Sequence, residues 1–252
     1  MVSGKTSKAV RSARVAVVTK KSTPWGLIAA VTAVVLFAGV VFGYAYYQQR
    51  ADADAVAALA PFTPSAENQD PSRAIEGVVV QTYQGGQHVG PDQQVAYTQS
   101  PPFGGAHDYS WATCSGVVYP EPVRNENMVH ALEHGAIWIA YNPDLVTGSA
   151  RDTLAAKASE QFMVMSPYSD LDAPISLQAW GHQLKLSDAS DPRIDQFIFA
   201  LRRNPYTAPE PNGSCGELGP GAFSQDAPPP FAPAPAPGTP GSVPETGGQP
   251  PA

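Results

Sequence analysis

The longest uninterrupted apolar segment of the chain runs from Trp25 to Tyr47 (WGLIAAVTAVVLFAGVVFGYAYY) and contains no charged residue. A helix of this length spans about 35 Å at about 1.5 Å per residue, enough to cross a hydrocarbon core of about 30 Å. Aromatic residues stand at both ends of the segment, as they do where a helix meets the two membrane interfaces. The pattern therefore predicts a transmembrane helix at 25–47.

Six basic residues and no acidic residue precede this helix, in positions 1–24. By the positive-inside rule this basic tail stays in the cytoplasm, and the chain after Arg50 lies outside the membrane. A cleaved signal peptide is the alternative, because the small residues of ADADAVAALA (51–60) could offer a cleavage site. Signal peptides usually have a shorter apolar region of roughly 7–15 residues. We therefore expect a signal anchor and a single-pass protein of the cell membrane.

The chain beyond the membrane segment divides into three parts of different composition. Residues 48–70 are rich in alanine, acidic residues and proline, which predicts a stalk that continues the helix until Pro61 ends it. Residues 71–217 contain the remaining periodic patterns and are expected to form one extracytoplasmic domain. Residues 218–252 are rich in proline, alanine and glycine, so we expect a disordered tail there.

The patterns within residues 71–217 change irregularly between strand and helix. Alternating or continuous apolar positions predict strands at 74–83, 136–141, 162–167, 175–180 and 182–186. Helical periodicity predicts helices at 126–134 capped by Asn125, at 150–161 capped by Ser149, and at 191–204 capped by Asp191. The expected fold class is α+β, a small domain with a mixed or antiparallel sheet and about three helices. Residues 84–124 form a long irregular excursion, which in compact domains is usually a binding or functional loop.

Charge and cysteine content narrow the functional classes. The chain has a formal net charge of −7 in spite of its basic N-terminal tail. An acidic exported part repels phosphate backbones, so we expect no nucleic-acid partner. Cys114 and Cys215 are the two cysteines. An even number in an oxidising compartment favours a disulfide, with free or metal-bound thiols as the alternative.

Candidate metal ligands are concentrated in VHALEH, where His130, Glu133 and His134 lie close together. On a helix the two histidines form an i, i+4 pair, so both imidazoles can reach one metal ion from the same face. In an inverted zinc-peptidase site, Glu133 would be the general base. Imidazole suits Zn²⁺ and Cu²⁺, and the sequence leaves the choice of cofactor between them open. A third protein ligand is also needed, and the candidates are His107, His182, Cys114 and Glu160.

Two features argue against a zinc peptidase. The predicted helix has only about nine residues before Gly135 ends it, and an apolar strand follows at once. A purely structural interpretation is the alternative. His134 then interacts with the dipole of the last helical turn, and His130 is a hydrogen-bonded core residue. Glu133 then pairs with a cation, either Arg124 or Lys157. An enzymatic role is therefore the less favoured hypothesis.

Four further residues carry weaker signals. Met163 and Met165 face the same side of a strand and could be soft copper ligands, but core filling is the preferred interpretation. Trp180 is expected to pack in the core. His88 lies in a glycine-rich loop, where a solvent-exposed histidine is ordinary.

Three stretches, PPFGGAHDY, VHALEHGAIWIAY and SPYSDLDAPISLQAWG, resemble one bacterial family, the domain-of-unknown-function family DUF3105. The family is common in actinobacteria and often carries a single N-terminal membrane anchor. The resemblance covers roughly residues 71–204, and LEHG (Leu132 to Gly135) is its most specific part. It brings no established activity. GGAH at 104–107 departs from the Ser-Gly-Pro-His type of turn that the resemblance implies. The implied motif positions are His107, His130, Glu133, His134, Gly135 and Trp180.

Three functional hypotheses follow. The first is an anchored extracytoplasmic domain that binds a metal ion through His107, His130, Glu133 and His134. The second is a structural or accessory subunit of an envelope complex, which would use the 84–124 loop and the C-terminal tail to contact protein partners. The third and least favoured is a metal-dependent hydrolase.

Overall fold

The computed structural model describes residues 23–219 and 221–247, so most of the predicted cytoplasmic tail lies outside the described residues. The chain forms two separate compact units, Met1–Asp54 and Ala55–Ala252. Helix α1 (Trp25–Leu59) contains the apolar segment and is long and apolar enough to cross a membrane. It continues past Tyr47 and gives way to a 3₁₀ helix, η1 (Ala60–Phe62), where Pro61 removes a backbone donor.

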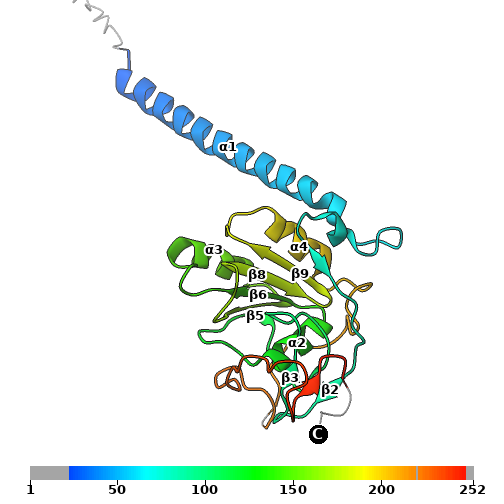
Figure 1. Ribbon diagram of the computed structural model, residues 1–252. Coiled ribbons are helices and arrows are strands. Elements are labelled where there is room, and N and C mark those ends of the chain that lie inside the picture. Colours follow the sequence, from blue (N-terminus) through cyan, green and yellow to red (C-terminus); the bar gives the residue numbers. More distant parts are fainter. Residues whose placement is uncertain (1–22, 220, 248–252) are drawn as a thin grey trace, which may run out of the picture. The chain divides into compact units, whose positions relative to one another are not determined.

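The second unit is built on a mixed six-stranded sheet with the strand order β1-β9-β8-β6-β7-β5 (Figure 1). β6 lies inside the sheet, parallel to β7 and antiparallel to β8. The α+β class and the mixed sheet are therefore confirmed. The strands are β1 (Val79–Val80), β5 (Ser115–Val118), β6 (Ile137–Tyr141), β7 (Met163–Pro167), β8 (Ile175–Ala179) and β9 (His182–Leu186). The helices of this unit are α2 (Asn125–Glu133), α3 (Gly148–Lys157) and α4 (Arg193–Leu201).

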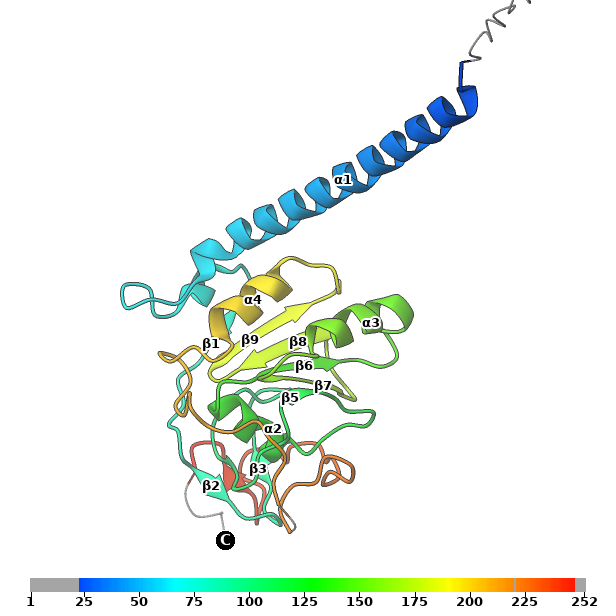
Figure 2. The same ribbon diagram turned by 180° about the vertical axis from the view of Figure 1, so that it is seen from behind.

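The sheet separates two hydrophobic cores, because successive side chains of a strand point to opposite faces. Ile137 of β6 belongs to the core that α3 and α4 cover, together with Leu154 of α3. The next residue, Trp138, belongs to the opposite core, together with Leu132 of α2. Figure 2 shows α3 and α4 on one side of the sheet and α2 on the other. The candidate ligands of α2 therefore lie on the face without α3 and α4.

Two short strand pairs organise the irregular excursion beneath α2. β2 (His88–Val89) pairs in parallel with β4 (His107–Asp108), which places His88 opposite His107. β3 (Val95–Ala96) pairs in parallel with β10 (Val243–Pro244) from the C-terminal segment. The excursion is thus held against α2 by pairings between residues far apart in the sequence.

Several predicted element boundaries are wrong. The expected strand at 74–83 is reduced to β1, because η2 (Pro71–Ala74) ends at its first residue and a turn follows before β1 begins. Asn125 is the first residue of α2 rather than its cap, and Ser149 likewise lies inside α3. Asp191 does support the start of α4, since its Oδ1 accepts a hydrogen bond from the backbone N–H of Arg193 at 2.9 Å.

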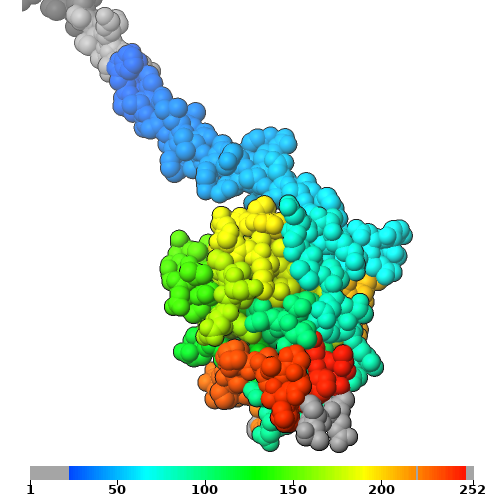
Figure 3. Space-filling view, in the orientation of Figure 1, coloured from blue at the N-terminus to red at the C-terminus, as the bar shows by residue number. Residues whose placement is uncertain are grey.

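Residues 221–247, where we expected a disordered tail, lie against the domain in the structure. The side chains of Phe223 and Val243 are buried in the core beneath the sheet. The backbone N–H of Val243 donates to the carbonyl of Gln94 at 2.8 Å. Figure 3 shows this segment lying on the surface of the domain. Its prolines already restrict the backbone, so docking costs less conformational entropy than for an ordinary segment.

Candidate metal centre

Helix α2 is buried along its whole length, which turns the His-x-x-Glu-His motif inward. His134 follows the helix as its C-terminal cap, and Gly135 adopts φ 92°, a left-handed conformation that favours glycine. A Cβ at Gly135 would also meet the Cα atom of Arg203 at 3.1 Å. The abrupt glycine stop is therefore a requirement of the fold, and it leaves the motif beside β4 and the 205–217 loop.

The imidazole of His130 is oriented by strand β4. Its Nδ1 lies 2.6 Å from the backbone carbonyl oxygen of Asp108. A carbonyl oxygen can only accept, so Nδ1 carries the hydrogen and Nε2 is left with its lone pair. That Nε2 atom lies 3.0 Å from Nε2 of His134.

His134 is oriented in the same way from the opposite side. Its Nδ1 lies 2.6 Å from the carbonyl oxygen of Ser214. The same reasoning leaves Nε2 of His134 as a free lone pair. Its closest carboxylate is Glu210, whose Oε2 lies 3.5 Å from that nitrogen. Two imidazole lone pairs thus face each other at a distance where they repel unless a cation or a proton lies between them.

His107 and Glu133 form a second close approach, and both side chains are fully buried. Nδ1 of His107 lies 2.8 Å from the carbonyl oxygen of Gly105, so its Nε2 is also free. Nε2 lies 2.8 Å from Oε2 of Glu133. Neither atom has a well-aligned hydrogen-bond partner among the described residues. The other oxygen, Oε1, accepts a hydrogen bond from the backbone N–H of Gly86 at 2.6 Å.

Burial opposes protonation of His130. Together with the nearby imidazole of His107, it lowers the pKa of His130 to about 3. Burial by itself would raise the pKa of Glu133, but contacts with His107 outweigh it and the pKa is lowered. The cluster therefore contains a buried carboxylate beside the neutral imidazole of His130. A buried negative charge needs a compensating positive one, and a metal cation bound by the free lone pairs would provide it.

His88 joins this cluster, although the sequence indicated an ordinary exposed histidine. Its ring centroid lies 4.8 Å from that of His107 and 5.1 Å from that of His130. It is half-buried, and the exposed ring of Tyr109 stacks on it with centroids 5.0 Å apart. No spacing rule signals His88, because its place depends on the parallel pairing of β2 with β4.

The potential ligand atoms fall into two sets. Within each set, all ligand atoms lie within 4.8 Å of one another. The inner set is His88, His107, His130 and Glu133, and the outer set is His130, His134 and Glu210. All five histidines of the chain belong to the described residues, and four of them are in these sets. Glu210 was not predicted either, and only the folding of the 205–217 loop onto α2 brings it here.

A disulfide fastens that loop. Cys114 and Cys215 are bonded, as predicted, and are therefore no metal ligands. The backbone N–H of Cys114 donates to the carbonyl of Cys215 at 3.0 Å, and that of Glu210 donates to the carbonyl of Glu133 at 3.0 Å. The indole Nε1 of Trp111 donates to the carbonyl of Gly216 at 2.9 Å. These bonds hold the loop in position over His134.

The other suggested third ligands lie elsewhere. Nδ1 of His182 lies 2.6 Å from the carbonyl oxygen of Trp180, and its Nε2 lies 3.1 Å from Oδ2 of Asp70, so both ring nitrogens are already engaged. Glu160 forms an exposed ion pair with Arg202. His107 is thus the one of the four suggested residues that joins the motif.

The suggested cation partners of Glu133 are also elsewhere. Arg124 pairs with Asp108 and Glu126, and Lys157 pairs with Asp195. Met163 and Met165 fill the core on the opposite face of the sheet. They are core residues and take no part in the cluster.

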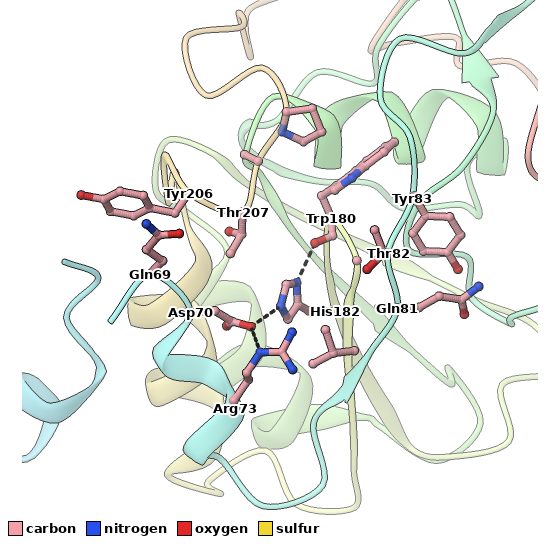
Figure 4. Close-up of a pocket in the computed structure, with 14 residues that line it drawn as sticks. Gln69, Asp70, Arg73, Gln81, Thr82, Tyr83, Trp180, His182, Tyr206 and Thr207 are labelled. Atoms are coloured by element: carbon pink, nitrogen blue, oxygen red, sulfur yellow. Dashed lines mark hydrogen bonds and ion pairs between the residues drawn. The ribbon is translucent and has the colours of Figure 1, made fainter. Parts of the chain in front are cut away.

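His182 and Asp70 line a separate pocket of about 340 Å³ (Figure 4). Arg73 also pairs with Asp70, with Nε and Oδ2 2.8 Å apart. Trp180 borders both regions, since it lines the pocket and its ring centroid lies 5.7 Å from that of His107. Trp180 is buried, as predicted, and it closes the inner set of ligands on this side.

The comparisons with known proteins agree with the motif. The family model described as protein of unknown function (DUF3105) matches residues 88–217. The matched part begins at His88 and includes every residue of both ligand sets. No curated protein and no solved structure matches the chain. Since the match covers more than half of the chain, this protein belongs to the DUF3105 family.

Proposed function

We propose that this protein is a membrane-anchored, extracytoplasmic metal-binding protein. The observation that carries the proposal is the convergence of three oriented imidazoles: His107 and His130 share a ligand set with the buried Glu133, and Nε2 of His134 lies 3.0 Å from Nε2 of His130. In His107, His130 and His134 the Nδ1 atom is committed to a backbone carbonyl, at 2.8, 2.6 and 2.6 Å. Hydrogen bonds of this kind fix the tautomer and orientation of metal-binding histidines in many proteins.

The donor chemistry favours a borderline transition metal. Imidazole nitrogens with one carboxylate suit Zn²⁺ and Cu²⁺, whereas Ca²⁺ and Mg²⁺ prefer oxygen ligands. Ligand atoms of one Zn²⁺ ion are roughly 3.3 Å apart in a tetrahedral site with bonds of 2.0–2.1 Å. The 2.8 Å separation between His107 Nε2 and Glu133 Oε2 needs only a small shift to reach that value.

Binding rather than hydrolysis is the favoured use of the ion. A peptidase needs a groove beside its metal, with the glutamate free to act on a bound water. Glu133 is fully buried, with Oε2 lying 2.8 Å from Nε2 of His107 and Oε1 accepting a hydrogen bond from the N–H of Gly86. That arrangement supports a ligand or charge-balancing role.

The anchor and the disulfide support the proposed location. One apolar helix, α1, could hold the protein in the membrane, and the Cys114–Cys215 bond suits an oxidising compartment. The basic residues before α1 favour an N-terminus inside the cell. An accessory subunit of an envelope complex is the alternative function, and it leaves the convergence of four histidines without a purpose.

Metal analysis tests the proposal. The full chain, purified in mild detergent and stripped with a chelator, is titrated with Zn²⁺ and with Cu²⁺ by calorimetry. We expect about one ion per chain, and loss of binding in the double variant His107→Ala/His130→Ala. His182→Ala is the matched control, because that histidine is buried but lies outside both ligand sets. Equal binding by the double variant and the control, or no binding by the wild type, would contradict the proposal.

A further inference from the structure

The inner and outer ligand sets share one residue, His130. Its Nδ1 is committed to the carbonyl oxygen of Asp108 at 2.6 Å. A neutral imidazole has one further lone pair, on Nε2, and that lone pair can bind one ion. The inner and outer sets therefore cannot both be complete at the same time.

One ion also cannot use every donor at once. Two ligand atoms of a single Zn²⁺ ion are at most about 4.2 Å apart, twice the bond length of 2.0–2.1 Å. Within each set a small contraction meets this condition, because the atoms already lie within 4.8 Å of one another. The ligand atoms of His134 and Glu210 do not lie within 4.8 Å of every ligand atom of the inner set. The sets are therefore two alternative positions for an ion.

The two positions differ in their access to solvent. His107 and Glu133 of the inner set are fully buried. The side chain of Glu210, in the outer set, is 50% exposed. Glu210 is the one exposed member of the two sets, whereas His88 of the inner set is half-buried and the other members are buried, so the outer position presents the most accessible ligand to an ion arriving from solvent.

The donors also make the inner position the stronger one. It combines three imidazoles with a fully buried carboxylate, and the outer position has two imidazoles and a solvated carboxylate. Electrostatic attraction to a cation is stronger in the buried position, where water screens it less. The ring of Trp111 lies beside the outer position, with its centroid 4.9 Å from that of His134 and 5.5 Å from that of His130.

We propose that the outer set is the loading position of the metal site. From there the ion passes to the inner set: it keeps its bond to Nε2 of His130 and exchanges His134 and Glu210 for His88, His107 and Glu133. His130 is bonded to the ion throughout, so the transfer never releases a bare ion into the core. The inference rests on the proposed metal-binding function and specifies how that site is filled and emptied. The protein would accordingly hold one ion at a time.

Loading and release kinetics test the inference. The full chain in detergent is stripped, mixed with Zn²⁺ and followed by stopped flow, and release is measured with a chromophoric chelator in excess. Glu210→Gln removes the exposed carboxylate without changing its size. We expect loading and release to slow together by the same factor, because the ion passes through the outer position in both directions. The equilibrium affinity should change by less than about twofold, because a change common to both rates cancels.

Matched variants separate the possible outcomes. Glu217→Gln removes an exposed acid from the same loop outside both sets, and its rates should equal those of the wild type. His107→Ala, which damages the inner set, should leave weak and rapid binding at the outer set. Wild-type rates in Glu210→Gln, or two ions per chain at saturation, would overturn the two-position scheme and leave the metal-binding function intact. Failure of the wild type to bind Zn²⁺ would overturn both.

Discussion

Removal of the Cys114–Cys215 disulfide is expected to destabilise the domain strongly. The two cysteines are 101 residues apart in the sequence. Closing a loop of this length removes conformational entropy from the unfolded chain worth about 4.7 kcal/mol at 25 °C. The total free energy of unfolding of a domain is commonly about 5–15 kcal/mol. The double variant Cys114→Ala/Cys215→Ala should therefore lose a large fraction of its stability.

The same bond also supports the outer ligand set. Ser214, the neighbour of Cys215, provides the carbonyl that orients Nδ1 of His134 at 2.6 Å. Without the cross-link, this part of the loop is held mainly by backbone hydrogen bonds such as that from Glu210 to Glu133. We expect the double variant, where it is still folded, to load Zn²⁺ more slowly than the wild type.

Equilibrium unfolding in urea provides the measurement, with the full chain in mild detergent and tryptophan emission as the signal. The wild type should be more stable than the double variant by about 4.7 kcal/mol in the absence of reductant. Repeating the titration with reductant is the control, because the unfolded wild-type chain then loses its cross-link and its midpoint should move to that of the variant. A difference below about 1 kcal/mol without reductant would refute the entropic argument.

Three further predictions concern single residues. Burial opposes ionisation of Asp70, but the contacts with His182, Ser72 and Arg73 together outweigh it and lower the pKa to about 2. Asp70→Asn should cost about 2 kcal/mol in urea unfolding at pH 7, and the penalty should disappear between about pH 4 and pH 2, where the carboxylate of the wild type is protonated. Gly213→Ala should slow Zn²⁺ loading in stopped flow, because a Cβ there would lie 2.3 Å from ring atoms of His134. Val243→Ala should lower the free energy of unfolding by about 2 kcal/mol, since its side chain is buried.

Two of these predictions have a matched control variant, and the third is checked by its dependence on pH. A penalty in Asp70→Asn that stays constant down to pH 2 would show that its carboxylate charge does not stabilise the fold. Gly216→Ala serves beside Gly213→Ala, because a Cβ there would meet only the Oγ of Ser214, at 3.4 Å. Val56→Ala removes the same atoms from an exposed position. Equal stability of the two valine variants would indicate that the C-terminal segment does not dock.

Local patterns in the sequence account for much of the fold. The length of the apolar run from Trp25 to Tyr47 and the later Pro61 predicted a helix that continues past the membrane segment, and α1 ends at Leu59. The apolar strand at 136–141 became β6, inside the sheet. These predictions succeed because helix ends and strand periodicity depend mainly on nearby residues. Weakly periodic segments failed, as the reduction of 74–83 to β1 shows.

The candidate site was only partly predictable. The spacing of His130 and His134 placed both on one face of a helix, and their Nε2 atoms do lie 3.0 Å apart. His88 and Glu210 had no comparable signal. His88 reaches the cluster through the pairing of β2 with β4, and Glu210 reaches it through a loop tied down by the disulfide.

The sequence by itself determined the membrane-type helix, the fold class, the disulfide pair and the histidine motif. The helix, the fold class and the motif depend on composition or on residues a few positions from one another. The disulfide does not, but a chain with two cysteines can form only one intramolecular pair. Only the tertiary structure decided that α2 faces inward, that the ligand atoms separate into two sets around His130, and that residues 221–247 dock. These features arise from contacts between segments that are distant in the sequence. The free energy of such contacts depends on the whole packed fold, so no periodic pattern within a single segment predicts them.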